Sequence, residues 1–147
     1  MKDLENFMEL IIPNLSENES FCRVVVASFA ARLNPVVEEI NELKTAVSEA
    51  VTNSILHAYE EGQYGKIIIK GEIEGNTLKL IFEDQGKGIE DLEKAKEPLY
   101  TTRPELERSG MGFTIMESFM NEVEVSSTPG KGTTVKMKKT FTSSKEN

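Results

Sequence analysis

Apolar residues recur with helical spacing early in the chain. The run FCRVVVASFAARL at residues 21–33 is apolar almost all round, and Ser16 with Glu19 three residues later has the pattern of a capping box. These features predict a largely buried first helix. Arg23, charged within this helix, is either a contact for a protein partner or a side chain that reaches solvent along its apolar stem.

A second, longer helix is predicted directly after the first. Asn34 and Pro35 supply a cap and a favourable first helical residue. The helix should run to about Tyr59, because the following apolar residues keep the 3.6-residue period: Val36, Ile40, Leu43, Val47, Val51, Ile55 and Ala58.

Strand patterns occupy much of the remaining chain. A short apolar run at residues 6–12 stops at Pro13 and would suit a sheet edge or a dimer contact. Gly75-Asn76 is typical of a hairpin turn. The other predicted elements are strands at residues 65–74, 77–83, 122–127 and 133–139 and a short helix at residues 113–120.

The order of these elements predicts an α/β fold. Helices that precede and separate hairpins favour a two-layer α/β sandwich, with a mixed, mostly antiparallel sheet and its helices on one face. We expect one domain over residues 1–141 and a flexible polar tail at residues 142–147. Residues 89–109 are polar, contain two prolines and lack an apolar stripe, which is typical of a functional lid or a disordered loop.

Composition narrows the possible functions. The 147-residue chain is 38% hydrophobic, enough for a core without disulfides or a structural metal. Cys22 has no second cysteine to pair with, and no export signal or membrane-length apolar run occurs. We therefore expect a cytoplasmic protein that does not bind a membrane. A formal net charge of −8 argues against direct nucleic-acid binding and leaves a protein partner or a locally bound anion.

Glu49, Asn53 and His57 lie four residues apart in SEAVTNSILHAY, residues 48–59. A regular helix would stack the three side chains on one side. The row is either a binding site or an ordinary solvated face. His57, near the helix end, can also serve simply to cap carbonyl groups.

Asp84-x-Gly86-x-Gly88 follows a predicted strand directly. The carboxylate would lie at the strand end, and the glycines would allow the close approach of a bulky ligand. A tight turn with an exposed aspartate is the alternative. A calcium loop is excluded, because positions 86 and 88 would then need side chains that carry oxygen.

Two further glycine pairs precede predicted elements. Gly110-x-Gly112 at a helix start offers backbone N–H groups and the positive end of a helix dipole to an anion, unless Ser109 simply caps the helix. Gly130-Lys131-Gly132 is not a Walker loop, because the lysine is followed by glycine. It favours a hairpin turn, with a hydroxyl of Thr133 or Thr134 close enough to face a ligand.

Each motif is weak alone, but their order resembles the GHKL superfamily of ATPases and kinases, which implies the Bergerat nucleotide-binding fold. EPLYTTRPELERSGMGFTIMESFMNEVEV, residues 97–125, together with SEAVTNSILHAY, resembles the anti-sigma-F factor family, protein serine kinases of sporulating bacteria. The resemblance covers essentially the whole chain. It separates the chain from sensor histidine kinases, because no segment here matches their helical dimerisation region with its phosphorylated histidine.

The resemblance implies roles for individual residues. Asn53 would give an oxygen ligand to Mg²⁺ bound with ATP or ADP, and Glu49 would accept the proton of an incoming serine hydroxyl. Asp84 would accept a hydrogen bond from the adenine amino group. The other residues assigned to the nucleotide are Gly86, Gly88, Thr101, Gly110, Gly112, Thr133 and Thr134. Independently of the resemblance, Arg108 is the nearest candidate cation for the γ-phosphate, ahead of Arg103 and Lys87.

The resemblance also implies two protein partners. A homodimer would sequester a sporulation sigma factor, and a small anti-anti-sigma protein would be phosphorylated on serine. The lid should order around ATP and loosen with ADP. Two alternatives remain open: a nucleotide-dependent binding module with negligible transfer, and a small ATPase that transfers phosphate to water.

Overall fold

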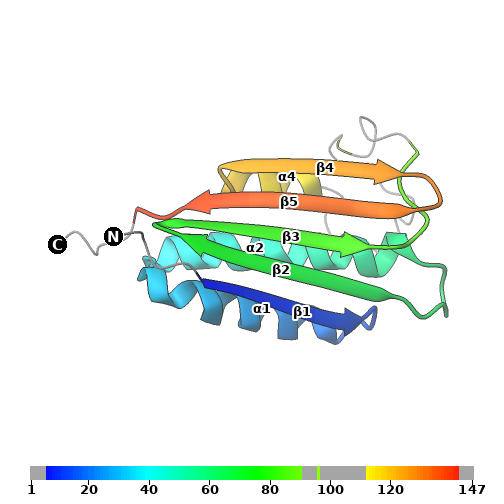
Figure 1. Cartoon of the computed structure of the whole chain (residues 1–147), viewed down its shortest axis with the longest axis horizontal. Coiled ribbons are helices and arrows are strands. Elements are labelled where there is room, and N and C mark those ends of the chain that lie inside the picture. Colours follow the sequence, from blue (N-terminus) through cyan, green and yellow to red (C-terminus); the bar gives the residue numbers. More distant parts are fainter. Residues whose placement is uncertain (1–5, 91–95, 97–111, 143–147) are drawn as a thin grey trace.

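Five strands form one sheet, and the helices cover one of its faces (Figure 1). The computed structural model describes residues 6–90, 96 and 112–142. In chain order the elements are β1 Asn6–Pro13, α1 Asn18–Ala30, a 3-10 turn Ala31–Leu33, α2 Val37–Asn53, a π-helical turn Ser54–Ala58, β2 Lys66–Glu74, β3 Thr77–Asp84, α4 Gly112–Phe119, β4 Glu122–Thr128 and β5 Gly132–Thr140.

The sheet has the strand order β1-β2-β3-β5-β4, and each of these four pairings is antiparallel. The predicted hairpins 65–74 with 77–83 and 122–127 with 133–139 are confirmed as β2–β3 and β4–β5. β1 pairs only with β2 and so forms a sheet edge, as its sequence predicted. The two-layer α/β sandwich is therefore confirmed.

Alternation along the strands explains why one face is covered. Successive side chains of a strand point to opposite faces, and in β2 and β3 every second residue is buried against the helices. Complete burial of one large apolar side chain contributes about 2 kcal/mol to the free energy of unfolding. The buried core residues of these two strands are Ile67, Ile69, Ile73, Leu78, Leu80 and Phe82.

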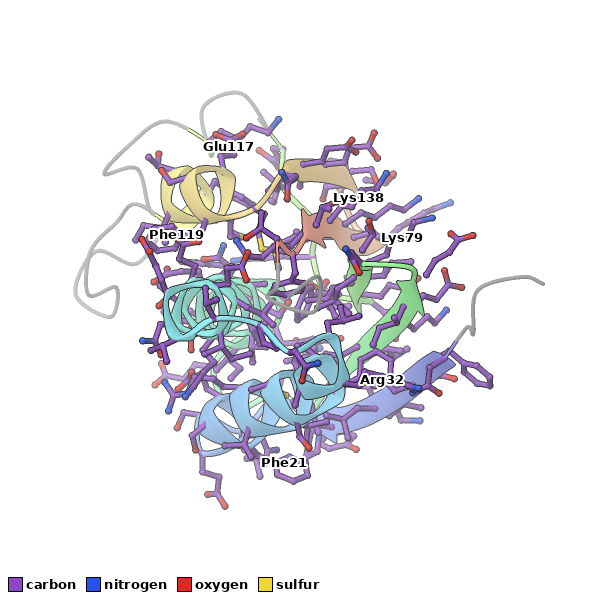
Figure 2. All side chains as sticks on the ribbon, turned by 90° about the vertical axis from the view of Figure 1, so that its left-hand side faces the viewer. Phe21, Arg32, Lys79, Glu117, Phe119 and Lys138 are labelled. Atoms are coloured by element: carbon purple, nitrogen blue, oxygen red, sulfur yellow. The ribbon has the colours of Figure 1, made fainter. Side chains whose placement is uncertain are left out.

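The other sheet face carries charged side chains. Lys79 pairs with Lys138 in the β3–β5 register, and each lies within ion-pair distance of a glutamate, Glu74 at 3.8 Å and Glu122 at 3.7 Å. Figure 2 shows both lysines extending from the sheet on the side away from the helices. This face is therefore a solvated surface of alternating charge.

The helix starts differ from the sequence prediction. Glu17 precedes α1 and makes no side-chain cap. The Glu19 carboxylate accepts a hydrogen bond from the Ser48 hydroxyl and forms an ion pair with Arg23, instead of completing a capping box with Ser16. Asn34 adopts a left-handed conformation with φ of 51° after the 3-10 turn. α2 then begins at Val37, where the Glu39 carboxylate accepts the backbone N–H of Val36 at 3.2 Å.

The second helix does not continue regularly to Tyr59. It changes to a π-helical turn at Ser54, and Tyr59 is already extended. His57 therefore lies in the π-helical turn, whereas Glu49 and Asn53 lie in regular α-helix. The alignment of His57 with the other two residues stays a prediction.

The ends of the predicted domain and lid are only partly described. Thr142, the first residue of the expected tail, donates its backbone N–H and its hydroxyl to the Glu39 carboxylate, both at 2.8 Å. Residues 143–147 and most of the predicted lid lie outside the described residues. Within the described part, no helix is both long and apolar enough to cross a membrane.

Candidate functional site

Asp84 ends β3 and is buried, with only 7% of its surface exposed. Its Oδ1 accepts the backbone N–H of Gly86 at 3.0 Å and of Thr133 at 3.2 Å, and its Oδ2 accepts the Ser54 hydroxyl at 3.2 Å. An ionised carboxylate has about four acceptor positions. The exposed aspartate of the tight-turn alternative is therefore wrong, and Oδ2 retains one acceptor position for a ligand donor.

Burial raises the pKa of Asp84 above its ordinary value, although the hydrogen bonds from Gly86, Ser54 and Thr133 act in the opposite direction. Removal of a carboxylate from water disfavours its charged form, whereas donors directed at its oxygens favour that form. The side chain is thus a buried acceptor, and its donors within the described part of the chain are all neutral groups. A ligand that brings a further N–H donor would further compensate the charge of the carboxylate.

Glycine is required around Asp84 because backbone segments approach one another closely. A Cβ on Gly86 would lie 2.1 Å from the carbonyl oxygen of Ala58, and one on Gly132 would lie 2.1 Å from that of Asp84. Gly88 has φ of +78°, and its Cβ would lie 2.4 Å from the carbonyl oxygen of Thr128. Gly86 and Gly88 were expected to allow a ligand to approach, and Gly132 was expected in a hairpin turn. At all three positions the nearest atoms that exclude a side chain belong to the protein backbone.

Hydrogen bonds hold the loop after Asp84 on both sides. Lys87 donates its backbone N–H to the Ala58 carbonyl at 2.7 Å, and its own carbonyl accepts the N–H of Gly130 at 2.7 Å. Further along, Ile89 donates its N–H to the Ser127 hydroxyl at 2.7 Å. The π-helical turn and the β4–β5 hairpin therefore fix this loop between them.

Tyr59 adds a third anchor at the same corner. Its buried hydroxyl donates to the Lys66 carbonyl at 2.7 Å and accepts the N–H of Gln85 at 3.0 Å. Gly65 lies against the ring, where a Cβ would come within 2.3 Å of it. The strand end that carries Asp84 is thereby tied to the start of β2.

The second part of the site lies between α2 and α4. A Cβ on Gly112 would lie 3.2 Å from Glu49 Oε1 and 3.3 Å from Asn53 Nδ2. Glu49 and Asn53 are both half-buried, so they do not lie on a fully solvated face. The N-terminus of α4, which is the positive end of the helix dipole, thus lies beside the carboxylate and the amide.

Asn53 and Gly112 suit a magnesium ion that is bound together with a polyphosphate. Mg²⁺ prefers hard oxygen ligands and commonly takes only one or two from the protein, with phosphate and water oxygens completing its shell. The Asn53 amide oxygen would be such a ligand, and it lies close to Gly112, where an added Cβ would come within 3.4 Å of it. Among the residues that the structure describes, no group of three or more His, Cys, Asp or Glu side chains could hold a metal.

Thr133 and Thr134, consecutive residues of β5, point to opposite faces of the sheet. Thr133 pairs with Asp84 across β3–β5, and its hydroxyl lies 2.8 Å from that of Ser127. Thr134 pairs with Glu83, whose side chain points to the opposite face. The structure therefore places Thr133 in the Asp84 cluster and Thr134 on the opposite face of the sheet. A ligand contact by Thr134 stays a prediction.

Several predicted residues lie outside the described residues, so the structure does not place them: Thr101, Arg103, Arg108 and Gly110. Lys87 is exposed beside the Asp84 loop. Sequence reasoning missed Ser54, Tyr59 and Ser127. In the sequence these residues stand out only by lying near a motif. Their contacts join segments that are distant in the chain, so local spacing does not reveal them.

Arg23 is engaged within the helical layer. Its guanidinium lies 3.4 Å from the Glu19 carboxylate and 3.4 Å from the Ser48 hydroxyl, while 37% of its side chain remains exposed. The contact with Glu19 lies within α1, whereas the contact with Ser48 joins α1 to α2. The exposed part leaves the partner-contact interpretation open.

Comparisons with known proteins agree with this geometry. The Histidine kinase-like ATPase domain family matches residues 12–139. An Anti-sigma F factor of Thermoanaerobacter sp. (strain X514) is 59% identical over 95% of this chain and 97% of its own. That of Bacillus subtilis (strain 168) is 53% identical over 97% of both chains.

Solved structures show the same fold. The RsbU and RsbW domains of a Mycobacterium tuberculosis protein match with a TM-score of 0.68 at 15% identity, over 92% of this chain and 32% of that one. The catalytic domain of the histidine kinase ThkA matches with a TM-score of 0.54 at 18% identity, over 92% and 97%. With these matches over nearly its whole length, the chain belongs to the Histidine kinase-like ATPase domain family of the GHKL superfamily, and within it to the anti-sigma F factors.

Proposed function

We propose that this protein is an ATP-dependent protein serine kinase that also sequesters a sporulation sigma factor. Its serine substrate would be an anti-anti-sigma protein. The observation that carries the proposal is the contact of the α4 N-terminus at Gly112 with Glu49 and Asn53. A carboxylate and an amide oxygen beside a helix N-terminus are the groups that phosphoryl transfer from Mg-ATP requires.

The base pocket is proposed around Asp84. Its free acceptor position would receive the adenine amino group, while Gly86 and Thr133 fix the carboxylate through their backbone N–H groups. The Ser127–Thr133 hydroxyl pair lies next to this carboxylate and can orient a water or a ring nitrogen. A carboxylate acceptor here favours the 6-amino group of adenine over the 6-carbonyl oxygen of guanine, so ATP and ADP fit better than GTP.

The transfer step is proposed at the α2–α4 junction. Mg²⁺, when bound through Asn53, would neutralise charge on the phosphate oxygens. Glu49, one helical turn away, would orient the serine hydroxyl and accept its proton as the hydroxyl oxygen attacks the γ-phosphorus. The bond from that phosphorus to the β,γ-bridging oxygen would break, and ADP would leave with the bonding electrons. Arg108, Gly110 and Thr101 are proposed to complete the phosphate contacts from the lid, which would order with ATP and loosen with ADP.

A homodimer in the cytoplasm is part of the proposal. Apolar side chains are exposed where β1 and α1 form one side of the molecule, among them Phe7, Ile11, Phe21 and Val24. Figure 1 shows α1 and β1 together at that side. Isolated exposed apolar residues are ordinary, but several at an open strand edge favour self-association. Arg23 is proposed as a nearby contact for the sigma factor or its competitor.

The decisive experiment is the mass of a candidate anti-anti-sigma protein before and after incubation with Mg-ATP and this protein. One added phosphate, mapped to serine, supports the kinase. Free phosphate without partner modification would instead indicate a small ATPase, and neither product would indicate a nucleotide-dependent binding module.

The Glu49→Gln variant tests the assignment of the base. We expect transfer to serine to fall at least about 100-fold, because a general base contributes about 10²–10⁴. Binding of Mg-ATP should remain near that of the parent, whereas Asn53→Ala should weaken it. Full transfer by Glu49→Gln would reject Glu49 as the base.

A further inference from the structure

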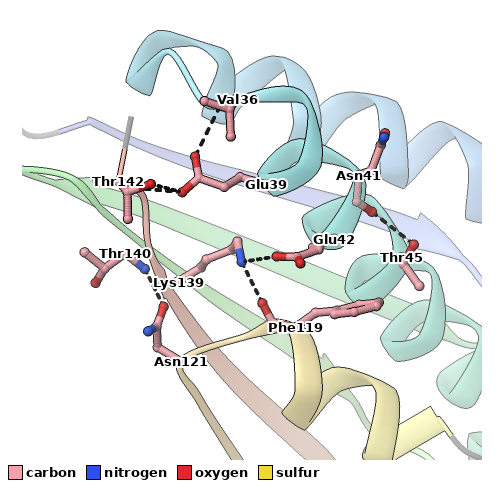
Figure 3. Close-up of polar contacts among 10 residues, drawn as sticks. All are labelled: Val36, Glu39, Asn41, Glu42, Thr45, Phe119, Asn121, Lys139, Thr140 and Thr142. Atoms are coloured by element: carbon pink, nitrogen blue, oxygen red, sulfur yellow. Dashed lines mark hydrogen bonds and ion pairs between the residues drawn. The ribbon is translucent and has the colours of Figure 1, made fainter. Parts of the chain in front are cut away.

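A buried lysine on β5 lies outside the proposed site. Lys139 is only 7% exposed and points into the helical layer. Its Nζ lies 3.0 Å from Glu42 Oε1 on α2 and donates to the backbone carbonyl of Phe119 at 2.7 Å (Figure 3). The same atom lies 5.9 Å from the ring centroid of Phe141. One ammonium group therefore joins the sheet, α2 and the last residue of α4.

The contact with Phe119 satisfies the C-terminal end of α4. The last carbonyls of a helix have no partner within it and carry the negative end of its dipole. A lysine there stabilises the helix in two ways, because it donates a hydrogen bond to a carbonyl and brings a positive charge to that end. Buried charges persist only when they are paired and hydrogen-bonded, and Glu42 supplies the pairing. Lys139 is the one cation that binds a carbonyl of α4 among the described residues.

The two ends of α4 meet α2 at matching positions. Gly112 at the start lies beside Glu49 and Asn53, and Phe119 at the end lies beside Lys139 and its partner Glu42. Gly112 and Phe119 are seven positions apart, as are Glu42 and Glu49, and seven steps correspond to about 10 Å along a helix axis. α4 therefore runs antiparallel to α2, and a contact at its far end fixes its axial position.

From this arrangement we propose that Lys139 is a positioning residue, which holds α4 so that Gly112 stays against Glu49 and Asn53. The inference rests on the proposed phosphate and metal site at that junction. If α4 shifted by one residue along its axis, Gly112 would move by about 1.5 Å relative to α2. Misplacement on the order of 1 Å can lower a rate about 100-fold.

A neighbouring contact holds the chain after α4 but not the helix itself. Asn121 donates its N–H to the Lys138 carbonyl at 2.8 Å, and its side-chain oxygen accepts the N–H of Thr140 at 2.7 Å. These bonds fix the turn into β4. The carbonyl of Phe119 accepts its hydrogen bond from Lys139 instead (Figure 3).

The test uses amide hydrogen exchange of the nucleotide-free protein together with ATP affinity. In Lys139→Met, a shape-conserving change, exchange within residues 112–119 should accelerate at least about tenfold relative to α1. ATP affinity per folded molecule should fall about tenfold, and the serine transfer rate should fall further. The free energy of unfolding is measured in parallel.

Two variants separate positioning from mere stabilisation. Glu42→Gln weakens the ion pair but keeps an oxygen for Lys139 and leaves the Phe119 contact, so stability should fall while ATP affinity stays within about threefold. Lys138→Met removes the adjacent lysine on the open face and should match the parent. If Lys139→Met does not fold, Lys139→Gln is measured in the same way.

Parent-like exchange in α4 of Lys139→Met would overturn the inference, as would equal loss of ATP affinity in Glu42→Gln. These results are distinct from failure of the proposed function. If the parent protein binds no ATP, the nucleotide proposal fails, and the exchange measurement alone still decides whether Lys139 positions α4.

Discussion

Asp84 shows how the properties of one residue depend on groups from three segments. The carboxylate receives donors from the loop that follows it, from the π-helical turn and from β5. Each donor removes part of the desolvation cost without adding a positive charge. The balance leaves the pKa of Asp84 raised, with burial as the largest cause.

Asp84→Asn should separate folding from nucleotide binding. The asparagine oxygen can accept from Gly86 and Thr133, and the Ser54 hydroxyl can rotate to accept from the new NH₂ group. The variant should fold with at least parent stability at neutral pH. Its adenine nucleotide affinity, measured by calorimetry, should fall at least about tenfold, or 1.4 kcal/mol, because a donor would face the adenine amino group.

The pH dependence of unfolding tests the same carboxyl group. Because its pKa is raised in the folded state, the folded protein binds the proton more tightly than the unfolded chain does. Stability relative to Asp84→Asn should therefore decrease as pH rises from the ordinary aspartate value through the raised value. Urea titrations over this range measure the difference, and an increase with pH would contradict the assignment.

At the scale of elements, the site depends on where α2 ends and α4 begins. Regular α-helix up to Asn53 keeps Glu49 and Asn53 one turn apart, and the π-helical turn then brings Ser54 to Asp84 and Ala58 to the following loop. π turns are frequent at functional sites. Here the turn links the proposed metal ligand to the proposed adenine pocket within five residues.

Gly112→Ala should impair binding with little effect on folding. Alanine is favourable within a helix, so the free energy of unfolding should change by no more than about 1 kcal/mol. Its Cβ would fill the space 3.2 Å from Glu49 Oε1 and 3.3 Å from Asn53 Nδ2. We expect Mg-ATP affinity to fall at least about tenfold in calorimetry.

The matched control for this substitution is Ser118→Ala, at an exposed position of the same helix. It should bind Mg-ATP like the parent. Unchanged affinity in Gly112→Ala would show that the phosphates do not occupy the space beside Asn53.

At the scale of the whole molecule, the antiparallel sheet leaves two strand edges. β1 and β4 each have one neighbour. The β4 edge carries Glu122 and Glu124 among its exposed residues, whereas the β1 edge has exposed Phe7 and Ile11. Charged edges resist pairing with another chain, and apolar edges favour it.

The α1 and β1 side should therefore form the dimer contact. Phe21 is 50% exposed and Val24 60% exposed, three residues apart on one helix face, and Figure 2 shows Phe21 projecting outward from α1. Phe21→Glu combined with Val24→Glu should raise the dimer dissociation constant on the order of 100-fold. Light scattering after size-exclusion chromatography measures the mass.

Tyr64→Glu is the control for this pair, because Tyr64 is 68% exposed in the loop before β2. It should retain the parent mass. A parent protein that is monomeric at high concentration would reject the homodimer, and a double variant that remains dimeric would locate the contact elsewhere.

The sequence determined the elements and the layers of this protein. Periods of 3.6 and 2 residues marked α1, α2, α4 and the two hairpins, because each element must direct its apolar side chains to one core. The order of the motifs around Asp84 and Gly112 also resembles that of a known family, to which the chain belongs. Local periodicity was sufficient for the elements, whereas the family followed from that resemblance.

Only the tertiary structure decided which groups meet. Ser54 and Ser127 join the Asp84 corner, Thr134 lies on the opposite face of the sheet, and Lys139 reaches the end of α4. The π-helical turn and the unused capping box of Ser16 were likewise beyond local pattern, because packing against distant segments outweighs local preference there. Spacing along the sequence determines which side chains share a face of one helix or strand. The contacts named here instead depend on how the strands are aligned in the sheet and on how the helices pack against it.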